Sequence, residues 1–239
     1  SGSKSYCFSN CRGMINAMSK PIVIYGAGGF GREVLQILRD INQSMPGTWD
    51  MLGFIVDDGY VTDEYVQGLP VLGGIEWLQR NKHVLVVIAV SAPSARYRIS
   101  NEIIRSCKNG FATIVHPRAW LGDSVKIGCG SVICAVALVT TDIDIGKHVH
   151  INIGSTIGHD AVLHDFVTLN PSVNISGNVT LHQGVEIGTG SVIIPHVHIG
   201  SWSVTGAGST VIKSLDENVT AVGTPARVIQ VRSSGWYEG

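Results

Sequence analysis

A histidine beside an aspartate is the arrangement in this sequence best suited to proton transfer. The chain of 239 residues holds nine histidines, and an imidazole that titrates near neutral pH is an effective general base. His159 is followed directly by Asp160, and a neighbouring carboxylate can orient and polarise an imidazole. His164 and Asp165 form a second pair of the same kind. These residue types indicate general-base chemistry by a histidine, and the residue types alone do not decide between the two pairs.

A glycine-rich segment near the start of the chain indicates a second chemistry, the binding of phosphate. Gly26, Gly28 and Gly31 have the spacing G-x-G-x-x-G between an apolar run and a helical pattern over residues 32–41. The backbone N–H groups of such a loop, together with the start of the helix, can bind a phosphate. Arg32 follows the third glycine and is a suitable phosphate partner. Close packing of the helix on the strand would also account for these glycines.

The elements around the glycine segment alternate between strands and helices. Apolar runs over residues 51–56 and 84–90 predict strands, and residues 95–107 predict a helix. Such alternation is typical of a parallel α/β domain. We expect this domain to span residues 20–112, after a tag or disordered leader over residues 1–19.

A strict six-residue period replaces this alternation from Val115 onward. An aliphatic residue recurs at every sixth position as far as Ile199 without a slip, and the fourth residue after each one is small or β-branched. A helix needs a period of about 3.6 residues, so the pattern predicts a parallel β-solenoid with one short strand and one corner in each hexad. Three hexads would make one coil. We expect the solenoid over residues 113–230 and a frayed tail over residues 231–239, with outward-facing histidines that line surfaces or subunit contacts at His148, His150, His196 and His198.

Composition excludes several functional classes. The 17 basic and 18 acidic residues leave a net charge of −1, whereas general nucleic-acid binding needs a basic surface. The sequence has neither an apolar run of membrane-spanning length nor the apolar core of a signal peptide. We therefore expect a cytoplasmic protein that binds neither membranes nor nucleic acid. The five cysteines are scattered, and although Cys7 and Cys11 are close, we expect no disulfide framework and no metal site.

The hexad register resembles that of the hexapeptide-repeat acyltransferases. With the glycine-rich N-terminal half, the chain as a whole resembles the bacterial nucleotide-sugar and sialic-acid acetyltransferase family, over nearly all residues beyond 20. The resemblance implies a small Rossmann-like parallel α/β domain followed by a left-handed parallel β-helix. It also implies acetyl-CoA as co-substrate, a nucleotide-activated amino sugar as acceptor and a homotrimer.

The same resemblance assigns roles to individual residues. The segment from Asn152 to Asp160 resembles the catalytic segment of the family, which makes His159 the general base and Asp160 its orienting partner, and places Asn152 toward the acceptor. Some amino-sugar members carry a second histidine near the acceptor, where this chain has Thr168. The backbone N–H of Gly177 would contact the thioester carbonyl. The remaining assignments are Asn178, Gly206, Gly208 and Pro225 for acetyl-CoA, and Gly26, Gly28, Gly29, Gly31, Arg32, Asp57 and Asp58 for the nucleotide sugar.

The resemblance implies transfer of an acetyl group to the amine of a nucleotide-linked 4-amino-deoxy sugar used for surface glycans, and this is the leading hypothesis. O-acetylation of a sialic-acid-type sugar is the alternative within the same reaction class. A trimeric scaffold with a nucleotide sensor is an alternative without catalysis. A γ-type carbonic anhydrase shares the solenoid and would need zinc, but the added nucleotide-type domain and the position of His159 beside Asp160 disfavour it.

Overall fold

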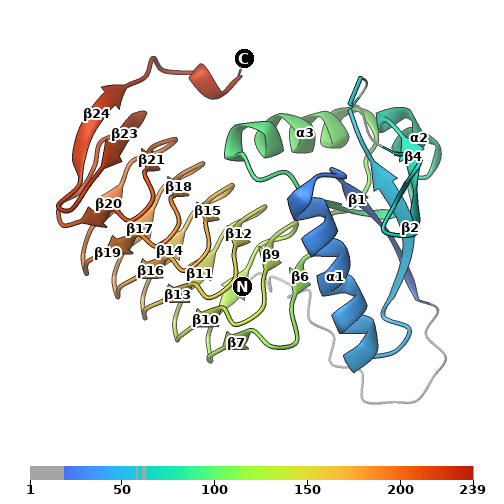
Figure 1. The fold of residues 1–239 in the computed structure, drawn as a ribbon, viewed down its shortest axis with the longest axis horizontal. Coiled ribbons are helices and arrows are strands. Elements are labelled where there is room, and N and C mark those ends of the chain that lie inside the picture. The colour runs from blue at the N-terminus through green and yellow to red at the C-terminus, as the bar shows by residue number, and fades with distance from the viewer. Residues whose placement is uncertain (1–18, 58, 61–62, 239) are drawn as a thin grey trace, which may run out of the picture.

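The structure is a computed structural model that describes residues 19–57, 59–60 and 63–238. An α/β domain is followed by a long parallel β-helix (Figure 1). The fold class expected from the sequence is therefore confirmed. Asp58 and most of the expected leader, with Cys7 and Cys11, lie outside the described residues.

A five-stranded sheet forms the centre of the N-terminal domain, in the order β3-β4-β2-β1-β5. The short β3 pairs antiparallel with β4, and the other neighbours are parallel. Because parallel strands end at the same edge, the loops after β1, β2 and β5 meet there. The strands are β1 (Lys20–Tyr25), β2 (Trp49–Ile55), β3 (Tyr65–Val66), β4 (Leu69–Gly73) and β5 (Leu85–Ile88).

Helices cover both faces of this sheet. The buried side of α1 (Gly29–Ser44) packs against one face, in a core that continues into the first strands of the β-helix. On the other face, α2 (Ile75–Arg80) and α3 (Pro93–Ser106) bury their apolar side chains. A Cβ on Gly31 would overlap the carbonyl of Gly26. Only glycine therefore lets α1 begin so close to β1.

The β-helix consists of two-residue strands separated by corners. The strands stack into three parallel sheets, here called sheets 1, 2 and 3. Sheet 1 holds β6 (Ile114–Val115), β9 (Val132–Ile133), β12 (His150–Ile151), β15 (Thr168–Leu169), β18 (Glu186–Ile187) and β21 (Val204–Thr205). Sheet 2 holds β7 (Trp120–Leu121), β10 (Leu138–Val139), β13 (Thr156–Ile157), β16 (Asn174–Ile175), β19 (Val192–Ile193) and β22 (Thr210–Val211). Sheet 3 holds β8 (Lys126–Ile127), β11 (Asp144–Ile145), β14 (Val162–Leu163), β17 (Thr180–Leu181) and β20 (His198–Ile199).

The sequence period matches these strands residue by residue. The aliphatic hexad positions are the second residues of the strands, and from Ile133 to Ile199 they are buried in one continuous core. Each strand pairs with the equivalent strand one coil away, as Leu138 does with Thr156. The six-residue period therefore predicts both the three sheets and which strand positions face the core.

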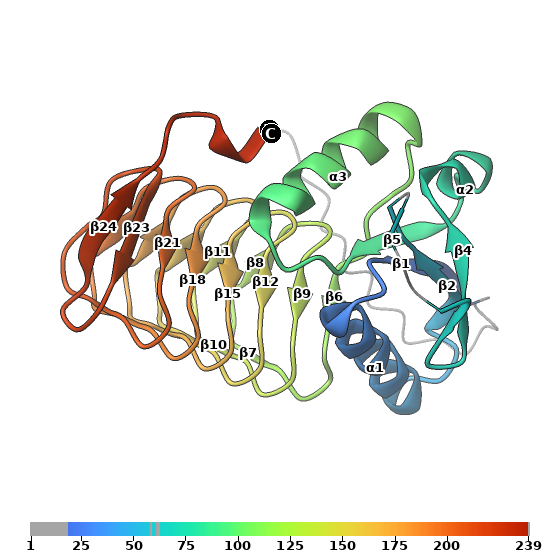
Figure 2. The same ribbon diagram turned by 45° about the horizontal axis from the view of Figure 1, so that its top comes forward.

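The C-terminal end folds back instead of fraying. Sheet 1 is extended by β23 (Val219–Val222) and the antiparallel β24 (Arg227–Val231), and a short 3₁₀-helix, η1, spans Trp236–Glu238. The ring of Tyr237 stacks on that of Trp202, with 3.9 Å between the ring centroids, and packs edge-on against Tyr97 of α3, with 5.9 Å between the centroids. The C-terminal segment thus returns to α3 (Figure 2). Aromatic packing overrides the polar, glycine-containing sequence that suggested a frayed end.

A buried arginine joins the two domains. Arg96 of α3 is fully buried, and its guanidinium donates hydrogen bonds to the carbonyls of Ser91 at 2.6 Å, Phe166 at 2.9 Å and His148 at 3.1 Å. It also donates to the hydroxyl of Thr168 at 2.8 Å. Carbonyl groups of both domains therefore bind this one guanidinium. Burial lowers the pKa of Arg96 to about 9.

Candidate active site and nucleotide pocket

His159 and Asp160 lie together at a corner between sheets 2 and 3. The Nδ1–H of His159 donates to Oδ2 of Asp160 at 2.7 Å, and the two side chains are 61% and 56% exposed. A carboxylate accepts but cannot donate, so this bond places the hydrogen of a neutral imidazole on Nδ1. Nε2 then carries the lone pair. The pair therefore has the protonation pattern of a general base open to an incoming acceptor.

The backbone of Gly177 lies directly beside the His159 ring, one coil further along. A Cβ on Gly177 would lie 2.7 Å from both Cε1 and Nε2 of His159. The next residue fixes the stacking, because the N–H of Asn178 donates to the carbonyl of His159 at 2.9 Å. The glycine leaves the space that the imidazole occupies, and it leaves an accessible backbone beside the basic nitrogen.

The tight corner itself follows from the sequence. Asp160 and Asn178 occupy equivalent corner positions with φ of 57° and 58°. Aspartate and asparagine adopt this left-handed conformation more readily than most residues. The same residue types that hold the corner thus supply a carboxylate beside the histidine.

The competing pair His164-Asp165 is arranged differently. The ring of His164 stacks on His182 at 5.1 Å, and the carboxylate of Asp165 accepts the backbone N–H of Lys147 at 2.7 Å. Asp165 thus stabilises the backbone of the preceding coil. Of the two pairs found in the sequence, the structure shows the histidine–carboxylate hydrogen bond in His159-Asp160.

Two histidines expected to face outward are instead buried between the domains. His148 and His150 are 3% and 1% exposed. Burial, with the charge of Arg96 as a second cause, lowers the pKa of His148 to about 4 and that of His150 well below its usual range. The repeat predicts that these side chains point away from the β-helix core, but it does not predict that the N-terminal domain covers them.

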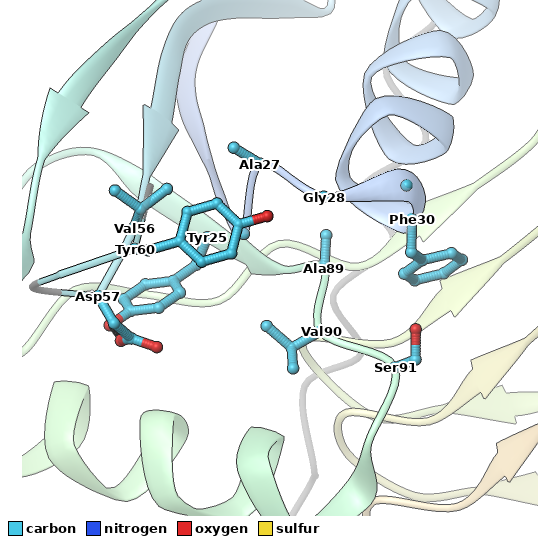
Figure 3. A pocket seen from close by; sticks show the side chains of 12 residues that line it. Tyr25, Ala27, Gly28, Phe30, Val56, Asp57, Tyr60, Ala89, Val90 and Ser91 are labelled. Carbon is cyan, nitrogen blue, oxygen red and sulfur yellow. Dashed lines mark hydrogen bonds between the residues drawn. The ribbon is translucent and has the colours of Figure 1, made fainter. Parts of the chain in front are cut away.

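The glycine segment lines a cavity of about 280 Å³ at the carboxyl ends of β1, β2 and β5 (Figure 3). Gly28 caps α1 without a side-chain hydrogen bond, and the first helical N–H to bond within the helix is that of Arg32. The N–H groups of residues 29–31 therefore remain available at the positive end of the helix dipole. This is the geometry of a phosphate site.

Polar groups at the other side of the cavity complete its lining. Asp57 follows β2 and accepts a hydrogen bond of 2.5 Å from the hydroxyl of Tyr25. The guanidinium of Arg32 lies 4.0 Å from the Cβ position of Gly29 but is not part of the cavity lining. Sequence reasoning missed Tyr25, Phe30, Tyr60 and Ser91, which also line the pocket. Their positions in the turns after parallel strands were the available signal.

The residues predicted to bind the acceptor and acetyl-CoA lie in different parts of the β-helix. Thr168 is buried, and its hydroxyl accepts from Arg96 and donates to the Ser91 carbonyl at 3.2 Å. The amide of Asn152 donates to the carbonyl of Leu169 at 2.8 Å, at the corner between sheets 1 and 2. In the last coils, the hydroxyl of Thr224, beside Pro225, donates to the carbonyl of Gly208. Gly206 precedes that corner, so these three acetyl-CoA candidates are close together.

One chain does not bring the predicted residues into a single site. His159 and Gly177 occupy the corner between sheets 2 and 3, whereas Asn152 and Gly208 belong to the corner between sheets 1 and 2. The glycine pocket lies against sheet 1, where Phe30 contacts His150 at 4.9 Å. A face of the triangular coil separates the base from the pocket.

Comparison with known proteins gives this geometry a family. The family model of the PglD N-terminal domain matches residues 21–103. GDP-perosamine N-acetyltransferase of Escherichia coli is 32% identical over 212 residues, which cover 85% of this chain and 94% of that protein. The chain belongs to the bacterial sugar acetyltransferase family.

Solved structures of sugar acetyltransferases share the fold across both domains. PerB from Caulobacter crescentus, in complex with CoA and GDP-perosamine, superposes with a TM-score of 0.80 and 26% identity, covering 88% of this chain and 97% of that one. The acetyltransferase domain of PglB from Neisseria gonorrhoeae, in complex with acetyl coenzyme A, gives 0.79 and 27%, covering 88% and 100%. The predictions of an acyltransferase and of acetyl-CoA as co-substrate are confirmed.

Among the described residues, no group of three or more histidine, cysteine, aspartate or glutamate side chains is arranged to hold a metal ion. None of the helices in the described part of the chain has the length and apolar character needed to cross a bilayer.

Proposed function

We propose that this enzyme transfers the acetyl group of acetyl-CoA to the 4-amino group of a GDP-linked 4-amino-deoxy sugar in the cytoplasm. The observation that carries the proposal is the His159-Asp160 pair beside Gly177, in a chain similar over most of its length to a GDP-perosamine N-acetyltransferase. The product sugar would serve surface glycans. The GDP preference rests on a relative that is named a GDP-perosamine N-acetyltransferase and on the structure of PerB in complex with GDP-perosamine.

His159 acts as the general base in this proposal. As the neutral amine attacks the thioester carbonyl, Nε2 of His159 accepts a proton from the amine nitrogen. Asp160 keeps the proton of Nδ1 in place and stabilises the imidazolium that forms. The tetrahedral intermediate then expels the CoA sulfur, and the proton on His159 passes to this thiolate. The products are an N-acetyl sugar and free CoA.

Gly177 supplies the group that stabilises the oxyanion. Its N–H donates to no backbone carbonyl in the portion of the chain that the structure describes, and it follows the His159 ring along the stack. An N–H fixed beside the base can hold the negative charge that develops on the carbonyl oxygen. Asn178, the next residue, is proposed to contact acetyl-CoA.

A homotrimer would unite the separated parts of the site. The nucleotide pocket of one protomer lies against its own sheet 1, while His159 lies at the corner between sheets 2 and 3. In a cyclic assembly, that corner of one protomer can face the pocket of the next. Exposed Trp120, Leu138 and Val192 on the outward side of sheet 2 support such contacts.

The acceptor is tested with a thiol-release assay. Acetyl-CoA is supplied with GDP-, UDP- and dTDP-linked 4-amino sugars, and with free and CMP-linked sialic acid. The proposal predicts turnover with the amino sugars and the highest kcat/KM with the GDP-linked compound. Turnover confined to sialic acids would contradict it and favour O-acetylation.

A further inference from the structure

The nucleotide pocket opens onto a row of outward side chains on sheet 1. Phe30 and Ser91 lie on the side of the pocket nearest the β-helix strands (Figure 3). Phe30 contacts the ring of His150, and the carbonyl of Ser91 accepts the hydroxyl of Thr168. His150 and Thr168 are paired neighbours in sheet 1. The mouth of the pocket therefore rests on these two positions of the row.

The next position in the row is a carboxylate. Glu186 pairs with Thr168 in the parallel register of sheet 1, and adjacent strands lie about 4.8 Å apart. Its side chain is half-buried, and Oε1 accepts a hydrogen bond from the amide of Asn170 at 3.2 Å. Glu186 thus lies one strand beyond the edge of the pocket, with a restrained carboxylate.

The direction of the bound substrate leads toward this carboxylate. The diphosphate is expected at the start of α1, where Phe30 belongs to the first turn. A sugar joined to the second phosphate continues away from the nucleoside, past Phe30 and Ser91. A sugar that extends from Ser91 along sheet 1 would next meet the position after Thr168, because adjacent strands lie about 4.8 Å apart.

Local ion pairing does not account for Glu186. The nearby guanidinium of Arg96 attracts the carboxylate through space, but it directs its hydrogen bonds to Thr168 and to carbonyls such as those of Ser91 and Phe166. A half-buried carboxylate gains most from donors that complete its hydrogen bonds. An amino sugar offers hydroxyl and ammonium donors.

The geometry points to Glu186, restrained by Asn170, as the residue that binds the polar substituents of the acceptor sugar outside the nucleotide pocket. This inference rests on the proposed function and adds a specificity-determining residue to it. Glu186 attracts amino sugars before deprotonation and holds the ring while His159 of a neighbouring protomer takes the proton. It contributes to the affinity for the sugar and not to the affinity for the nucleotide.

Calorimetric titration of the full-length protein with GDP and with GDP-perosamine tests this assignment. Glu186→Gln is expected to weaken GDP-perosamine binding by about 10-fold or more, as for loss of a charged hydrogen bond, with GDP binding within about 2-fold of wild type. Asn170→Ala should give a smaller loss in the same direction. In turnover, KM for the sugar nucleotide should rise while KM for acetyl-CoA stays constant.

Asp144→Asn is the matched control, because Asp144 is an outward carboxylate on sheet 3 that pairs with Lys126 at 3.0 Å. It should change neither affinity. Unchanged GDP-perosamine binding in Glu186→Gln would overturn the inference, and parallel loss of GDP binding would assign Glu186 to the domain contact. If the wild-type protein prefers another nucleotide-linked amino sugar, the titrations use that sugar nucleotide and its free nucleotide instead of GDP-perosamine and GDP. The inference would also be overturned if the wild-type protein bound no sugar nucleotide more tightly than the corresponding free nucleotide. Acetyl transfer measured in the same preparation would show whether the proposed function still holds in that case.

Discussion

The imidazole of His159 occupies the space that a side chain on Gly177 would fill. A Cβ at that position would lie 2.7 Å from Nε2, closer than a methyl carbon can approach a ring nitrogen. The proposed base and the proposed oxyanion donor are therefore coupled by packing. A change in either residue should affect the same catalytic step.

Replacement of His159 by alanine should lower kcat by about 10²- to 10⁴-fold, the usual effect of losing a general base. The affinity for CoA should be retained, because the side chain is exposed and its absence leaves the β-helix core unchanged. Steady-state kinetics with CoA titration separates the two effects. Asp160→Asn should cause a smaller loss, since the imidazole keeps its place but loses its carboxylate partner. Full activity in His159→Ala would remove this residue from the mechanism.

Gly177→Ala should displace the His159 ring and lower kcat by an order of magnitude or more, because the added methyl group competes with the imidazole for space. The double variant with His159→Ala provides the control. If both changes act on one step, the double variant should be no less active than His159→Ala alone. Independent, multiplying losses would show that Gly177 acts elsewhere.

The stability of the protein should fall in mild acid because of His148. Its pKa is lowered to about 4 by burial, so below about pH 6.5 the unfolded chain binds a proton that the folded chain excludes. The free energy of unfolding should therefore decrease as the pH falls from 6.5 toward 4, by up to about 3 kcal/mol for this residue. Above pH 6.5 this contribution should be constant. Urea unfolding at a series of pH values measures the slope.

His148→Phe should reduce that slope by the share of His148 and leave the share of the buried His150, since phenylalanine can keep the ring contacts with Phe111 and Phe166 but cannot titrate. His196→Phe is the control, because His196 has a similar positive φ but is exposed. An unchanged slope in His148→Phe would show that other groups cause the loss in acid.

Arg96→Met should lower the free energy of unfolding by about 3 kcal/mol or more, because the buried carbonyls that Arg96 binds would lose their donors. Arg96→Lys should recover only part of this loss, since an ammonium lacks the planar fork of a guanidinium. Urea unfolding gives the values. Arg105→Met is the control at an exposed position of the same helix. Equal stabilities of the Arg96 and Arg105 variants would contradict the role of Arg96 in joining the domains.

The proposed trimer, with active sites shared between protomers, predicts complementation between inactive variants. Gly28→Phe should fill the nucleotide pocket, which Gly28 lines, without using a positive φ. His159→Ala removes the base. Co-expression should form mixed trimers in which an intact pocket faces an intact His159, and activity should return. Two inactive variants that remain inactive in verified mixed trimers would show that pocket and base come from one protomer.

The sequence allowed much of this architecture to be predicted, because the hexad period specifies which side chain enters the core of every coil. The period places Ile157 in the core and, two residues later, His159 at a corner. It does not specify what covers an outward side chain. The burial of His148, His150 and Thr168 depends on docking of a domain distant in sequence, through Arg96. The C-terminal contact depends on a long-range match between Tyr237 and Trp202, which no local pattern reports.

The most direct test of the central claim is product analysis after incubation of wild-type protein with acetyl-CoA and GDP-perosamine. Mass spectrometry and NMR of the sugar nucleotide would reveal whether an acetyl group has joined the 4-amino nitrogen. We predict one N-acetyl group for each free thiol released, with turnover strongly reduced in His159→Ala. Intact GDP-perosamine, or acetylation at a hydroxyl group, would contradict the proposed reaction.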